Sequence, residues 1–114
     1  MNKEAMKDQI KEAKLEKQLS WQQIAETTSM STEFVVSACL GMNHLEKADA
    51  DAVAACLGLP SEVSIALQQY PNKKWEQTVP TDPAIYRLYE IVGVYGETIK
   101  ELIHEEFGDG IMSA

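Results

Sequence analysis

An arginine and a glutamate three residues apart are the side chains of this sequence best suited to chemistry. They are Arg87 and Glu90 in the segment IYRLYE, and Arg87 is the only arginine of the 114 residues. Residues three apart on a helix lie on one face, so the two side chains are expected to meet. Arginine presents a planar fork of donors that matches a carboxylate-shaped anion, which lysine does not. The pair therefore indicates a site for a small planar anion. The alternative is an exposed ion pair worth about 0.2–0.5 kcal/mol.

The helix that carries the pair has a clear predicted start. Asp82 is suited to the N-cap and Pro83 to the first helical position. Three tyrosines near the pair favour its partial burial, and a buried charge needs a partner. Gly93 and Gly96 predict a break, followed by a second helix over residues 97–107 with an inward-facing stripe. That stripe is Ile99, Leu102, Ile103 and Phe107, and a strand is expected to begin at Ile111 and Met112.

The preceding part of the chain has the pattern of an all-helical bundle. Helices are expected over residues 3–18, 20–27, 32–40, 47–57 and 60–69, with Pro60 in the first position of the fifth. The second and third, joined by a short turn, have the helix-turn-helix arrangement of lambda-repressor-like domains. The fold class is therefore mainly α: a bundle over 1–70, a connector over 71–80 and a helical segment over 81–114. The predicted core of the bundle includes Leu19, Trp21, Ile24, Phe34, Val35, Leu40, Val53, Leu57 and Leu67.

Charge argues against nucleic acid as a partner. The net charge is −8, and residues 20–68 hold six acids against Lys47 alone. Sequence-independent binding to nucleic acid comes from neutralising phosphates with lysine and arginine. The helix that would enter a DNA groove, STEFVVSACL, has no lysine, arginine, asparagine or glutamine to contact bases. A helix-turn-helix fold is thus expected without its usual function.

The sequence also gives no sign of a metal site, a signal peptide or a membrane span. Cys39 and Cys56 lie in apolar helical patterns and are expected to be buried, reduced thiols. Glu101 and His104 have the spacing of one half of a carboxylate-bridged metal motif, but the second copy is absent. No apolar run approaches the roughly 20 residues of a membrane helix, and the N-terminus is too charged for a secretory signal. We expect a cytoplasmic protein.

Two long motifs resemble the cyanase (cyanate hydratase, cyanate lyase) family. They are PTDPAIYRLYE and HEEFGDGIMSA, which match that family's C-terminal part, and the segment LSWQQIAETTSMSTEFVVSACLG is similar to its N-terminal bundle. The resemblance implies decomposition of cyanate with bicarbonate to carbamate and carbon dioxide, carbamate then giving ammonia and more carbon dioxide. Carried over by motif, the catalytic residues are Arg87, Glu90 and Ser113. Glu90 either orients Arg87 or transfers a proton.

The resemblance also implies how the enzyme is built. No metal or organic cofactor is expected, and bicarbonate is a co-substrate rather than a cofactor. Family members are homodecamers, five dimers in a ring, with active sites at subunit interfaces. They continue past the GDGIxSA motif into a strand-forming segment that interlocks two subunits, whereas this sequence stops at Ala114. The alternatives are therefore a catalytically silent, truncated relative that only oligomerises, and a helix-turn-helix DNA-binding regulator.

Overall fold

The described residues form six helices, and the chain divides into two compact units. The computed structural model describes residues 1–71 and 82–108. The units comprise Met1–Pro71 and Asn72–Ala114. The first contains α1 (Lys3–Lys17), α2 (Trp21–Ala25), α3 (Thr32–Cys39), α4 (Lys47–Leu57) and α5 (Ser61–Gln68), and the second contains α6 (Pro83–Phe107). No strand occurs in the described residues, so the mainly α class is confirmed.

Local chemistry determines where the helices of the first unit begin and end. The Ser20 hydroxyl accepts from the Gln23 amide at 3.0 Å, while the Gln23 side chain accepts from the Ser20 amide at 2.8 Å, which starts α2 with a capping box. At the end of α4, Gly58 adopts a left-handed conformation with φ 66°, which glycine allows without steric cost. Pro60 was predicted inside the fifth helix. It is the N-cap instead, with extended ψ of 168°.

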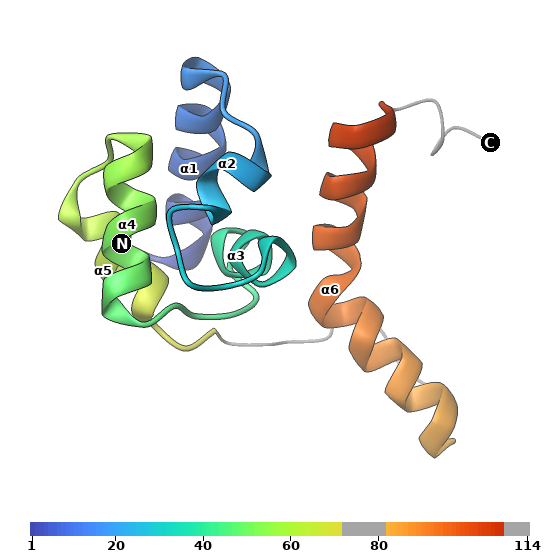
Figure 1. Ribbon diagram of the computed structural model, residues 1–114. Coiled ribbons are helices and arrows are strands. Elements are labelled where there is room, and N and C mark those ends of the chain that lie inside the picture. Colours follow the sequence, from blue (N-terminus) through green and yellow to red (C-terminus); the bar gives the residue numbers. More distant parts are fainter. Residues whose placement is uncertain (72–81, 109–114) are drawn as a thin grey trace. The chain divides into compact units, whose positions relative to one another are not determined.

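The first unit is a bundle around one apolar core, in which α4 packs against α5 and α2 against α3 (Figure 1). Seven of the nine predicted core residues are buried, whereas Leu19 and Phe34 are only partly buried. Leu19 lies in the turn between α1 and α2, and Phe34 lies in the first turn of α3. The side chains that close the core include Met6, Ile10, Trp21, Ile24, Val35, Val53, Leu57 and Leu67.

The second unit corrects one prediction. The expected break between Gly93 and Gly96 is absent, because α6 continues as one helix from Pro83 to Phe107. Each glycine costs about 1 kcal/mol relative to alanine, but the helix continues through both. The ribbon instead changes direction in its middle (Figure 1), a common result of glycine within a helix. The expected strand at Ile111 and Met112 lies outside the described residues.

Candidate active site

The position of Arg87 follows from the cap of its helix. The Asp82 carboxylate accepts hydrogen bonds from the amides of Ala84 at 3.0 Å and Ile85 at 3.1 Å. Pro83 occupies the first turn, where its missing amide proton is not needed. These contacts confirm the predicted start of α6. They place Arg87 about one turn into the helix, with the backbone already regular.

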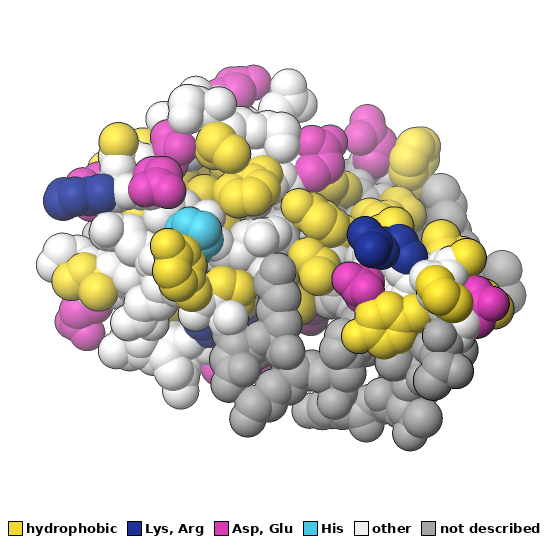
Figure 2. Space-filling view, turned by 90° about the horizontal axis from the view of Figure 1, so that it is seen from below, with side chains coloured by type: hydrophobic (Ala, Val, Ile, Leu, Met, Phe, Trp, Pro, Cys, Tyr) yellow, Lys and Arg dark blue, Asp and Glu magenta, His cyan; other side chains and the backbone are white. Residues whose placement is uncertain are grey.

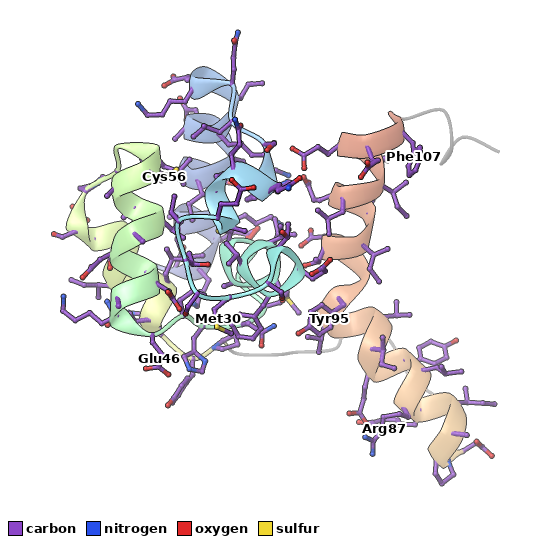
Figure 3. All side chains as sticks on the ribbon, viewed as in Figure 1. Met30, Glu46, Cys56, Arg87, Tyr95 and Phe107 are labelled. Atoms are coloured by element: carbon purple, nitrogen blue, oxygen red, sulfur yellow. The ribbon has the colours of Figure 1, made fainter. Side chains whose placement is uncertain are left out.

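Arg87 and Glu90 do lie on one face of α6. Arg87 Nε is 4.0 Å from Glu90 Oε1, which is close enough for an ion pair and too long for a hydrogen bond. Figure 3 shows Arg87 extending outward from the first half of the helix. Among the described residues, this loose ion pair is the interaction that the structure gives the guanidinium group. A guanidinium group offers five N–H donors, more than one loose ion pair uses.

Partial burial of the pair, predicted from the nearby tyrosines, is wrong for Arg87 in the single chain, whereas Glu90 is partly buried. The side chains of Arg87 and Glu90 are 76% and 43% exposed. Tyr86 and Tyr89 are themselves exposed, because they lie along a helix whose large apolar side chains face solvent, whereas Tyr95 is partly buried. Figure 2 shows hydrophobic side chains gathered over this part of α6, with charged side chains among them. Those exposed between Pro83 and Val92 are Ile85, Tyr86, Leu88, Tyr89, Ile91 and Val92.

The apolar side chains leave only a narrow strip of the helix polar. At 3.6 residues per turn, the six occupy roughly 220° of the circumference of α6. Arg87 and Glu90 lie in the remaining strip. A helix that is apolar on most sides is normally covered by protein. The first half of α6 thus has the character of an interface segment, with the charged pair along its one polar edge.

The third predicted site residue, Ser113, lies outside the described residues. The structure therefore brings together two of the three, and the role of Ser113 stays a prediction. Within residues 1–71 and 82–108, no three His, Cys, Asp or Glu side chains are placed to bind a metal ion. In the same ranges, no helix is long and apolar enough to cross a membrane.

The fold and the pair together define a helical protein with a candidate anion site on its final helix. Two family models match the chain and cover nearly all of it. Residues 3–71 match "Cyanate hydratase, N-terminal", and residues 77–114 match "Cyanate lyase C-terminal domain".

Individual relatives agree with the family models. The chain is 54% identical over 101 residues to the cyanate hydratase of a Marinomonas species, covering 89% of this chain and 69% of the relative. It is 56% identical over 102 residues to that of Teredinibacter turnerae, covering 90% and 70%. The cyanate hydratase of Ralstonia pickettii is 53% identical over 116 residues, with 100% of this chain and 78% of the relative covered.

A solved structure extends the likeness to three dimensions. The crystal structure of cyanase from T. urticae matches with a TM-score of 0.55 and 34% identity, covering 88% of this chain and 72% of that one. The protein belongs to the cyanate hydratase family, also called the cyanate lyase family.

Proposed function

We propose that this protein is a cyanate hydratase. It decomposes cyanate with bicarbonate to carbamate and carbon dioxide, and carbamate then breaks down to ammonia and carbon dioxide. The observation that carries the proposal is identity above 50% to enzymes of that name over most of the chain. We further propose that it acts in the cytoplasm and requires no metal or organic cofactor.

In this proposal Arg87 binds and orients the two anions. Cyanate and bicarbonate are both small and negatively charged, and a protein of net charge −8 must concentrate positive potential where they bind. The guanidinium fork supplies that potential with fixed geometry, and holding two reactants in place removes much of the entropic barrier to their reaction. Glu90 orients Arg87 or transfers a proton. Ser113 donates a hydrogen bond to one of the anions.

In this proposal the reaction takes place in a setting of low dielectric constant. The single chain does not provide that setting, because Arg87 is exposed to water in it and Glu90 is only partly buried. The apolar first half of α6 supports assembly with further copies that would cover it. We propose a homodecamer of five dimers, in which neighbours bury the helix and leave its polar strip facing the site. Burial would strengthen the attraction between Arg87 and the anions by lowering the local dielectric constant.

Ammonia release tests the proposal directly. The full chain is incubated with cyanate, with and without bicarbonate, and ammonia is measured over time while size-exclusion chromatography gives the oligomeric state. Ammonia formation that requires both protein and bicarbonate is the expected result. An assembled oligomer that releases none would show a catalytically silent relative. Salt-sensitive retention on DNA, without ammonia release, would show the helix-turn-helix regulator instead.

A further inference from the structure

One lysine of the first unit is held in an unusual way. Lys3 opens α1, and its Nζ donates a 2.7 Å hydrogen bond to the Ala66 carbonyl in the last turn of α5. A longer contact of 3.5 Å reaches the Asn43 carbonyl in the loop between α3 and α4. The Lys3 stem lies over Gly41, where an added Cβ would be 3.3 Å from Lys3 Cβ. The half-buried side chain thus joins three segments of the unit.

The partners of Lys3 carry no compensating negative charge. Both hydrogen-bond acceptors are neutral carbonyl oxygens, and no carboxylate among the described residues pairs with this amine. Lys47, by contrast, lies 2.7 Å from the Asp51 carboxylate. Burial without a counter-ion disfavours the charged form of an amine. Accordingly, desolvation lowers the pKa of Lys3 from its ordinary value.

The other titratable group near Lys3 does not reverse this effect at neutral pH. The Cys39 thiolate would raise the pKa of Lys3 if it formed. Burial, however, raises the pKa of the Cys39 thiol to about 12, so the thiol stays neutral. Burial without a carboxylate partner therefore makes the neutral amine of Lys3, which is the nucleophilic form, easier to reach than it is for a lysine in water.

We propose that cyanate carbamoylates Lys3 in preference to ion-paired lysines such as Lys47. The inference rests on the proposed function for one point, that the protein works in the presence of cyanate. A neutral Lys3 amine can keep one N–H on the Ala66 carbonyl while its lone pair remains available to a reactant.

The reaction needs no co-reactant and has no leaving group. The Nζ lone pair attacks the carbon of isocyanic acid, the protonated form of cyanate, and a new N–C bond forms. The electron pair of the C=N π bond moves to the cyanate nitrogen, which takes up the proton that the amine loses. The product is a neutral carbamoyl-lysine with no change of oxidation state.

Modification should loosen the first unit. The carbamoyl group is larger than the amine and uncharged, so the half-buried position over Gly41 can no longer hold the contacts to Ala66 and Asn43. Loss of a hydrogen-bond donor that joins three segments should lower the Tm of the protein by about 5 °C. Cyanate would in this way modify and destabilise the protein that acts on it.

The test follows modification by mass. The full chain is incubated with cyanate near neutral pH without bicarbonate, so that the proposed reaction does not consume the reagent. Peptide mapping then compares carbamoylation of Lys3 and Lys47 over time. Lys3 should react several-fold faster, with the fall in Tm following its modification. Equal rates, or a faster Lys47, would overturn the proposal.

Two variants keep the test decisive. Lys3→Arg retains a donor that stays protonated and cannot add cyanate under these conditions, so cyanate should no longer lower its Tm. Asp51→Asn removes the counter-ion of Lys47 and should raise the rate at which Lys47 is carbamoylated. The rate at Lys3 should stay the same, so the ratio of the Lys3 rate to the Lys47 rate should fall. A ratio unaffected by Asp51→Asn would contradict the role assigned to charge pairing.

The proposed function is tested separately, by measuring ammonia release after bicarbonate is added. Lys3 modification without ammonia release would refute the enzyme and not the modification site. Ammonia release without a preference for Lys3 would do the reverse.

Discussion

Replacing Arg87 with lysine separates the geometry of the cation from its charge. Arg87→Lys keeps the positive charge but exchanges a planar fork for a single ammonium point. In the single chain the side chain is 76% exposed and its Nε lies 4.0 Å from Glu90 Oε1, so the pair contributes at most about 0.5 kcal/mol to the stability of one subunit. The Tm should therefore change by no more than about 3 °C. The Arg87→Lys variant is therefore expected to keep the fold of the unmodified protein.

Activity should respond very differently. If Arg87 holds an anion through two parallel N–H bonds, lysine loses one oriented donor where negative charge must be stabilised. Loss of one such preorganised donor costs about 2.7–4 kcal/mol in the transition state, or roughly a hundredfold to a thousandfold in rate. The measurement is the initial rate of ammonia release over a range of cyanate concentrations at saturating bicarbonate. A fall mainly in kcat would place the lost interaction in the transition state, and a rise mainly in KM would place it in binding.

Lys100→Arg is the matched control, because it makes the related exchange on the same helix away from the proposed site. It should leave both Tm and rate unchanged. Size-exclusion chromatography of each variant checks that assembly is intact. A rate for Arg87→Lys within about threefold of the unmodified protein would refute the oriented-fork argument. A Tm that fell together with the rate would show instead that Arg87 has a structural role.

Three further changes test the first unit by thermal unfolding. Leu57→Ala leaves a cavity at a position that is 1% exposed and should lower the free energy of unfolding by about 2–5 kcal/mol. Ile65→Ala is the control, because Ile65 is 57% exposed and its truncation should lower that free energy much less. Similar losses for the two variants would contradict the assigned core. Ser20→Ala removes the capping box of α2 and should cost about 1 kcal/mol, lowering Tm by several degrees, and an unchanged Tm would count against the cap. Hydrogen bonding to Lys47 is the largest cause that lowers the pKa of Asp51 in the folded protein. The ionised carboxylate therefore stabilises the fold at pH values above the unfolded pKa of about 3.9. This stabilisation is lost as the pH falls through the lower pKa of the folded state. In the Asp51→Asn variant, Tm should accordingly fall less steeply with decreasing pH below about pH 5. An unchanged slope of Tm against pH would contradict the stabilising role of the Asp51 carboxylate.

The parts of the fold that the sequence predicts well depend on neighbouring residues. Ser20 and Asp82 each carry an oxygen that satisfies amides two or three residues later, and Gly58 adopts the left-handed conformation that ends a helix. Such signals act within a single turn, so they can be recognised without knowing the rest of the structure. The break predicted at Gly93 and Gly96 failed because glycine weakens a helix without supplying other partners for its backbone.

The candidate site was predictable to the same local extent. The spacing of Arg87 and Glu90 correctly predicted that they share a face of α6. Their exposure could not be predicted, because it depends on surfaces distant in sequence. The same limit hid Lys3, whose hydrogen-bonded partners lie 40 and 63 positions further along the chain. Nothing near Lys3 in sequence marks it out from the other lysines of the first helix.

The exposed apolar side chains in the first half of α6 also have a consequence for the newly made protein. Until something covers them, these residues present the kind of surface that chaperones and proteases recognise and through which chains aggregate. The amount of protein in a cell should therefore depend on how quickly this surface is covered after synthesis, and not only on the stability of the first unit. Substitutions that slow its coverage would lower abundance while leaving Arg87 and Glu90 intact.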